Sequence, residues 1–318
     1  MIEEVPWENG KEDIKNYEIA ITGKAFEYMI NKKSDNSMNS EIETYSAVLK
    51  HAKIYARMSP DHKAILVNEI QKSTEFMVGM WGDGANDCKA LKAADIGLSL
   101  SEAEASIAAP FTSKVQNISP MIQLLREGRS SLVTSFQVFK YMAVYSMIQF
   151  FTVVILYFQA TRLSSYQYLY IDLFIIIPLS VTMSRTEAYY KLDKALPVGK
   201  LISSSVLTSV INQTVIQITF LVIMYIILIK QNWFVPLVTH GENITLWYET
   251  TTLFFVSLPQ YILVVITFSI GKPFKQPMWR NYSLLISLFV VSWASLYIIM
   301  VRKFLYFNFL FNFSKFDN

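Results

Sequence analysis

The chain has 318 residues, of which 53% are hydrophobic and only 17% are charged, whereas an average soluble domain carries about 25% charged residues. This composition argues against an ordinary soluble enzyme, and the single cysteine, Cys88, excludes a scaffold stapled by internal disulfides. The net charge of +3 is too small to indicate a nucleic-acid partner, so we expect none.

The small net charge conceals two different regions. Residues 1–130 carry 15 Lys and Arg against 19 Asp and Glu, whereas residues 131–318 carry 13 against 6. The first region has the composition of a soluble acidic domain, and the second is apolar with basic loops. We therefore predict a soluble domain over 1–130 followed by a transmembrane domain over 131–318.

Short β-prone runs alternate with helical patterns in the first region. This alternation predicts βαβ units and a parallel sheet. The polar stretch at 31–41 has no apolar period and predicts a loop. The predicted strands are 17–23, 53–58, 76–82 and 96–100, and the predicted helices are 47–51, 61–72 and 87–94.

The sequence GDGAND follows the third predicted strand and precedes a helix. Ligands of open parallel sheets bind beyond the carboxyl ends of the strands, which is where Asp83, Asn86 and Asp87 would lie. Two carboxylates and an amide supply the oxygen ligands that Mg²⁺ prefers, so we predict a magnesium site at Asp83 and Asp87. Gly82 and Gly84 would let the backbone approach a ligand closely. The alternative is a simple turn in which Asp87 caps the following helix.

Lys63, in ARMSPDHKAILV, begins a predicted helix directly after the second strand. This position puts it at the same predicted sheet edge as Asp83. A lysine there could neutralise a phosphoryl group during its transfer, which is mainly an electrostatic task. The alternative is a solvated lysine on the surface of a helix.

Five apolar runs in the second region approach the length of about 20 residues that a membrane helix needs. Basic residues gather in the loop between the second and third runs and in the loop between the fourth and fifth. The positive-inside rule places these loops, and with them the soluble domain, on the cytoplasmic side. The predicted spans are 131–158, 166–183, 201–229, 250–270 and 281–301.

Asp172 is the only acidic residue within these predicted spans. Ionisable groups inside a membrane are costly and usually face a partner or a water-filled path, so Asp172 predicts a functional site. Tyr145 and Gln149 lie one turn apart on the first span and would line a path with Asp172. Hydrogen bonding between helices is the alternative for these two. Lys140, near the cytoplasmic end of its span, is expected to snorkel.

Several longer segments resemble the P-type ATPases. ARMSPDHKAILVNEIQK and VGMWGDGANDCKALKAADIGLSLSEAEASIAAPFTS resemble the phosphorylation-domain end of that family. Cys88, SEAEASIAAPF and GRSSLVTSFQVFKYMAVYSMIQF resemble the type V, subgroup B members in particular. This subgroup is similar to lysosomal and vacuolar polyamine exporters.

The resemblance implies both a fold and a function. Residues 1–130 would be the C-terminal portion of an α/β, haloacid-dehalogenase-like (Rossmannoid) phosphorylation domain on the cytoplasmic side, followed by an all-α transmembrane bundle. The complete enzyme would use ATP as substrate and magnesium as cofactor, and it would transport polyamines or other cations across a lipid bilayer. An endolysosomal or vacuolar membrane is the location that the resemblance implies.

The resemblance also implies roles for individual residues. Asp83 would bind magnesium and Lys63 would contact the aspartyl phosphate. Asn86 and Asp87 would support the phosphate site. A carboxylate with an aromatic face suits a linear polycation. The residues at positions similar to those lining the family's polyamine path are Tyr145, Gln149 and Asp172.

Other motifs of the family are missing from the sequence. The phosphorylated aspartate of the family lies in a DKTG motif, which is absent here, as are the TGES and TGD motifs. We therefore expect the C-terminal part of a pump, without its actuator and nucleotide-binding domains, that cannot hydrolyse ATP alone because it has no nucleophilic aspartate. Its partner would be the missing N-terminal half. The alternative is a non-catalytic truncated membrane protein that associates with or regulates a full-length pump.

Overall fold

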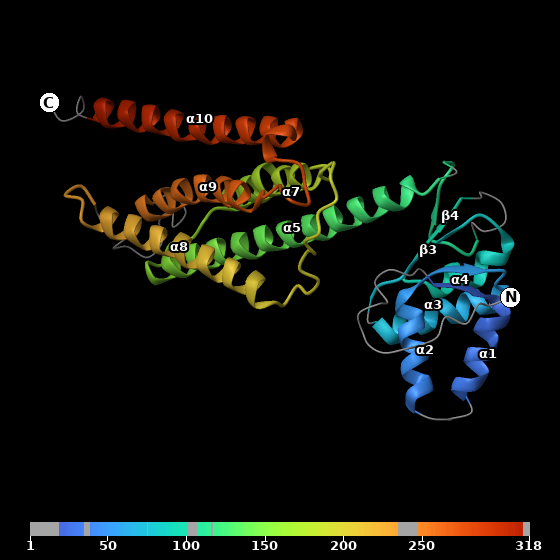
Figure 1. Ribbon diagram of the computed structural model, residues 1–318. Helices are drawn as coiled ribbons and strands as arrows, with labels where there is room; N and C mark the ends of the chain where they lie inside the picture. Colours follow the sequence, from blue (N-terminus) through green and yellow to red (C-terminus); the bar gives the residue numbers. More distant parts are fainter. Residues whose placement is uncertain are drawn as a thin grey trace. The chain divides into compact units, whose positions relative to one another are not determined.

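The computed structural model divides the chain into two units, residues 1–123 and 124–318, each with its own hydrophobic core (Figure 1). The structure describes residues 19–34, 39–74, 76–100, 107–115, 117–234 and 247–313.

The first unit contains short parallel strands. β1 (Ile19–Thr22) pairs with β2 (Ala52–Ala56), while β3 (Gly79–Gly82), β4 (Ile96–Ser99) and β5 (Phe111–Thr112) pair in that order. The parallel pairing is confirmed, but the expectation of one sheet is wrong, because the described strands form two sheets and β5 was not expected. Alternation of strands and helices predicts parallel pairing, yet it does not say which strands are neighbours.

Four helices accompany these strands. They are α1 (Gly23–Ser34), α2 (Asn39–His51), α3 (Pro60–Thr74) and α4 (Cys88–Ala93). The predicted loop at 31–41 is wrong at both ends, where α1 continues and α2 has already begun. Polar turns at the ends of two helices look like a loop when composition alone is read. The core between the helices and the first sheet is formed by Ile21, Phe26, Tyr45 and Leu49.

The second unit is helical. Within the described residues, five helical segments are long and apolar enough to cross a membrane, which confirms the predicted number of spans. Four are continuous, with α8 packed against α9 and α10 packed against α9 (Figure 1). These four are α5 (Ser119–Phe158), α8 (Ser204–Ile229), α9 (Tyr248–Phe268) and α10 (Tyr282–Phe313).

The second span is not a continuous α-helix. It consists of α6 (Ser165–Leu169), the π-helical segment η3 (Tyr170–Ile176) and α7 (Ile177–Ser184). Pro178 explains the irregularity, because proline lacks an N–H and its ring clashes with the carbonyl four residues earlier. The N–H of Ile177 instead donates to the carbonyl of Asp172, five residues back.

The core of the second unit lies between α5, α7 and α9. Tyr141, Leu179 and Tyr261 are among its almost completely buried side chains. The outer faces are apolar as well, as at Ile216 on α8 and Phe289 on α10. Apolar faces that lack a protein neighbour are the surfaces that lipid covers in a membrane protein.

The two loops predicted to be cytoplasmic contact each other. The N–H of Tyr189 donates to the carbonyl of Phe274 at 3.0 Å. The next residue, Lys275, is 1% exposed, and its Nζ donates to Oε1 of Gln137 on α5 at 2.9 Å. Burial disfavours the charged ammonium and lowers the pKa of Lys275 to about 8.

Candidate functional site

The GDGAND sequence forms the turn between β3 and α4. Gly82 ends β3 opposite Ser99 of β4, so both strands end at the same edge. The chain then turns through a short 3-10 helix, in which the N–H of Asp87 donates to the carbonyl of Gly84 at 3.0 Å. Asp83 and Asn86 are exposed, whereas Asp87 is buried.

The structure brings Lys63 and Asp87 together at this edge. Lys63, in the first turn of α3, donates from Nζ to Oδ1 of Asp87 at 2.8 Å. Gly82 makes room for the aspartate, because a Cβ on Gly82 would lie 2.7 Å from the second carboxylate oxygen, Oδ2. Real Cβ contacts are not that short, so glycine is required where Asp87 folds against the end of β3.

Asp83 is exposed in the same turn as Asp87, and among the described residues its carboxylate has no hydrogen-bond or ion-pair partner. Across the described part of the chain, His, Cys, Asp and Glu side chains do not gather in groups of three or more that could hold a metal ion. The oxygens at this turn therefore fit only an ion that needs few protein ligands. Magnesium is such an ion, because it keeps waters and substrate phosphate oxygens in its shell. Asp83 and Asn86 fit that requirement better than Asp87, one of whose oxygens already accepts from Lys63.

A second cluster lies within the membrane-spanning segments. The Tyr145 hydroxyl on α5 donates to Oδ1 of Asp172 on η3 at 2.5 Å. The Tyr145 ring also packs edge to face with the ring of Tyr261 on α9, with 5.8 Å between ring centroids. Gln149 lies half-buried one turn further along α5, and within the described chain it forms no hydrogen bond with Tyr145 or Asp172. The structure thus joins two of the three residues predicted for the path.

The backbone around Asp172 is irregular. Asp172 lies inside the π-helical segment, a type of turn that occurs frequently at functional sites. Its half-buried carboxylate forms no ion pair within the part of the chain that is described. Lys140 is a charged residue of a neighbouring span, but it does not pair with Asp172. Its Nζ lies over the ring of Phe268, 5.8 Å from the ring centroid.

The sequence analysis did not identify all of the aromatic residues that surround Asp172. Tyr168 and Tyr261 both lie within electrostatic reach of Asp172. Tyr141, fully buried beside Tyr145 and Tyr261, has a hydroxyl without a hydrogen-bond partner among the described residues. The spacing of Tyr141 and Tyr145, one turn apart, is a signal that could have been read from the sequence.

The expectation that Asp172 is the only acidic residue in a span is wrong. α9 begins at Tyr248, so it includes Glu249, which is 0% exposed. The predicted span started at 250, directly after Glu249, because a charged residue does not look like part of an apolar segment.

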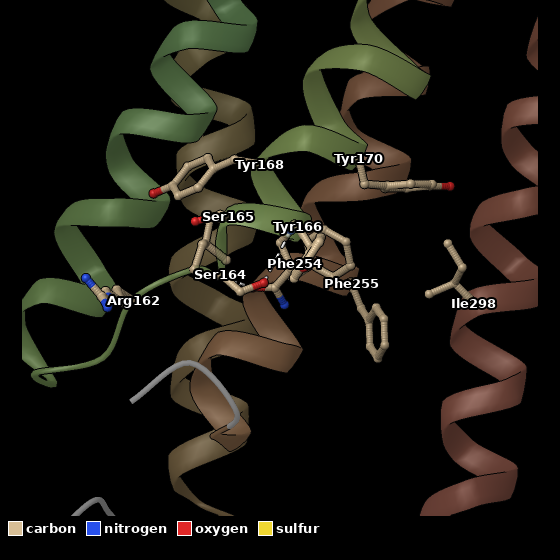
Figure 2. Close-up of a pocket in the computed structure, with 11 residues that line it drawn as sticks. Arg162, Ser164, Ser165, Tyr166, Tyr168, Tyr170, Phe254, Phe255 and Ile298 are labelled. Atoms are coloured by element: carbon tan, nitrogen blue, oxygen red, sulfur yellow. Dashed lines mark hydrogen bonds between the residues drawn. The ribbon is translucent and has the colours of Figure 1, made fainter. Parts of the chain in front are cut away.

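An aromatic pocket of about 810 Å³ opens beside α6, where α9 and α10 also contribute residues. Figure 2 shows the rings of Tyr168 and Tyr170 pointing in opposite directions and the Arg162 side chain near the loop that precedes α6. Tyr168 belongs both to this lining and to the surroundings of Asp172. The ring-bearing residues of the lining are Tyr166, Tyr168, Tyr170, Phe254 and Phe255.

Comparison with known proteins gives a consistent set of relatives, although no protein-family model matches the chain. The vacuolar cation-transporting ATPase YPK9 of Saccharomyces cerevisiae is 43% identical over 281 residues, which cover 88% of this chain and 19% of that protein. The human polyamine-transporting ATPase 13A3 is 40% identical over 313 residues, covering 91% and 24%. The human polyamine-transporting ATPase 13A2 is 45% identical over 248 residues, covering 77% and 21%. The chain thus spans roughly a fifth to a quarter of the length of these relatives.

Proposed function

Because the chain belongs to the type V family of P-type ATPases, we propose that it is the C-terminal part of an ATP-driven polyamine transporter that works through an aspartyl phosphate. The observation that carries this proposal is the Tyr145–Asp172 hydrogen bond within two membrane-spanning segments. Asp172 accepts a hydrogen bond from a neutral hydroxyl and, among the described residues, forms no ion pair with Lys or Arg, so its negative charge is available to a cationic substrate.

The surroundings of Asp172 suit a protonated amine. One carboxylate oxygen accepts from Tyr145, which leaves the other free to accept from an ammonium group. Tyr168 and Tyr261 lie within electrostatic reach of Asp172, and a cation over an aromatic ring would gain about 0.5–2 kcal/mol. A linear polycation needs only one carboxylate for each ammonium group that passes the site, whereas a metal ion would need several oxygen ligands around it.

At the sheet edge, we propose that the first unit is part of a haloacid-dehalogenase-like phosphorylation domain. Asp87 would hold the Lys63 ammonium toward an aspartyl phosphate supplied by the rest of the pump. Asp83, with Asn86 and the free oxygen of Asp87, would hold magnesium. The ion would supply positive charge that neutralises the phosphoryl oxygens. Gly82 permits this arrangement because it leaves space for the Asp87 carboxylate.

The 318 residues contain no DKTG motif, so we propose that the chain by itself forms no phosphoenzyme. Incubation of the purified chain with labelled ATP should give no acid-stable, hydroxylamine-sensitive label, and such a label would contradict this part of the proposal. The second candidate function is association with a full-length pump. The missing DKTG motif favours it, because a chain that forms no phosphoenzyme can still bind a pump that does. Co-purification of the tagged chain with such a pump from its own cells would support it.

We also propose a location in an endolysosomal or vacuolar membrane, because one relative is described as vacuolar. Fluorescence of the tagged chain should coincide with a marker of that membrane. A signal confined to another membrane would contradict the location.

The transport proposal is tested in a complete pump that carries this segment. Asp172→Asn keeps the shape of the side chain and removes its charge. We expect the spermine concentration that half-stimulates ATP hydrolysis to rise about tenfold or more, as for loss of a hydrogen bond to a charged group. Gln149→Ala should raise it less. Asp193→Asn, in a loop, is the matched control and should leave it unchanged. Unchanged stimulation in Asp172→Asn would contradict the polyamine assignment.

A further inference from the structure

A second carboxylate is buried at the N-terminal end of α9. Glu249, in the first turn of α9, is 0% exposed, and neither of its carboxylate oxygens has a hydrogen-bond partner within the described residues. Thr250 beside it is also 0% exposed, and its Oγ1 is likewise without a partner there. By the positive-inside rule, this end of α9 lies on the non-cytoplasmic side.

The helix end does not account for this arrangement. An acidic residue near a helix N-terminus interacts favourably with the helix dipole, but that effect reaches only about 2 kcal/mol even where the group is partly buried. The cap residue of α9 is Trp247, and its side chain makes no capping hydrogen bond. A fully buried carboxylate without hydrogen bonds is unfavourable unless another group satisfies it.

The groups around Glu249 are suited to accept hydrogen bonds from a cation. Tyr225 on α8 lies within electrostatic reach of the Glu249 carboxylate. Thr250 adds an unpartnered hydroxyl oxygen. Within the described chain, no Lys or Arg forms an ion pair with Glu249. The two carboxylate oxygens and the hydroxyl oxygen therefore lack the positively charged or N–H donor that burial requires.

The same interface contains further unsatisfied oxygens along its length. Gln260 on α9 donates to the carbonyl of Gln217 on α8 at 3.1 Å, but its own Oε1 has no partner among the described residues. Thr214, one turn before Gln217, also has a buried hydroxyl without a partner there. The α8–α9 interface is thus polar at several depths, and Glu249 supplies its negative charge.

We propose that Glu249, with Thr250 and Tyr225, is a second cation-binding site that takes one protonated amine of a polyamine on the non-cytoplasmic side. The inference rests on the proposed transport function. Tyr261, which neighbours Asp172, lies twelve residues further along α9, or about 18 Å at the rise of an α-helix. One ammonium group cannot contact both carboxylates, so the two sites would bind different amines or act in succession.

The test is peptide-resolved labelling of carboxyl groups with dicyclohexylcarbodiimide, which reacts with carboxyl groups in apolar surroundings. A complete pump that carries this segment is labelled with and without spermine, and the α9 peptide is analysed by mass spectrometry. We expect label on Glu249 that spermine suppresses. In Thr250→Val and Tyr225→Phe, the spermine concentration for half-protection should rise about tenfold, as for loss of a hydrogen bond to a charged group.

The controls separate this site from the Asp172 site. Glu249→Gln should lose the α9 label, while Glu187→Gln, in a loop, should leave label and protection unchanged. Protection of Glu249 that persists in Asp172→Asn would support an independent second site. Label on Glu249 that spermine does not suppress, in a pump whose ATP hydrolysis spermine still stimulates, would overturn the second site and leave the transport proposal standing. If spermine changes neither labelling nor ATP hydrolysis, both proposals fail.

Discussion

The two candidate sites treat their aspartates in opposite ways. In the first unit, Asp87 is neutralised by Lys63 at 2.8 Å, whereas in the second unit Asp172 accepts only from the neutral hydroxyl of Tyr145 at 2.5 Å. A carboxylate that is already paired orients its partner, while one that lacks a cationic partner attracts a cation from outside. The carboxylate of Asp172, which has no cationic partner among the described residues, therefore indicates a positively charged ligand at that site.

The largest effect should come from the exposed carboxylate of the first site. In a complete pump carrying this segment, Asp83→Asn should lower magnesium-dependent phosphorylation about a hundredfold or more, because the substitution removes the negative charge that would hold the ion that neutralises the phosphoryl oxygens. Membrane insertion should be unchanged, since the Asp83 side chain is exposed and asparagine has nearly the same shape. Phosphorylation at the wild-type rate would show that Asp83 is only a turn residue.

Lys275 extends the comparison to a buried cation held by a neutral group. Its pKa, about 8, is below the ordinary value of 10.5, so between these values the unfolded chain holds the proton that the folded chain has released. Stability should therefore rise with pH across this window, by up to about 3 kcal/mol. Below the window the charged, buried lysine destabilises the fold.

The measurement is thermal unfolding of the detergent-solubilised chain between pH 7 and 10.5, the ordinary lysine pKa, beside Lys275→Met. Methionine keeps the apolar length of the side chain without the charge. The variant should lose the rise in stability with pH. An equal rise in both proteins would show that Lys275 does not carry it.

A smaller effect is expected from the paired aspartate. Asp87→Asn keeps the contact with Lys63 but weakens it, so the lysine is less well oriented. We expect the phosphorylation rate to fall about tenfold, as for the weakening of a hydrogen bond to a charged group. The phosphorylation rate of Lys63→Met should fall by a similar factor. The rate of the double variant should be little lower than that of either single variant, because the two side chains act as a unit. Additive losses would contradict the role of Asp87 as a positioning residue.

The sequence predicts local features of this molecule better than long-range ones. Apolar run length is a local property, and it predicts five spans, which is also the number of helical segments in the described residues that are long and apolar enough to cross a membrane. The proline at 178 also signals the irregular span, because its effect falls on neighbouring residues. The Lys63–Asp87 contact joins residues 24 positions apart, and the sequence predicts only that both lie at one sheet edge. Glu249 was missed because its neighbours are polar although its surroundings are buried.

The membrane aromatics show the same limit. Tyr145 and Gln149 share a helix face, which spacing predicts, but the contribution of Tyr261 depends on how α9 packs against α5. The separation of the strands into two sheets likewise depends on packing that no local pattern contains.

Equilibrium binding of labelled spermine tests most directly whether the unpaired charge of Asp172 selects the ligand. It is measured on a purified complete pump carrying this segment, in the wild type, in Asp172→Asn and in the control Asp193→Asn. The account predicts that Asp172→Asn weakens spermine binding about tenfold or more, while the control binds as the wild type does. Equal affinity in all three proteins would contradict it.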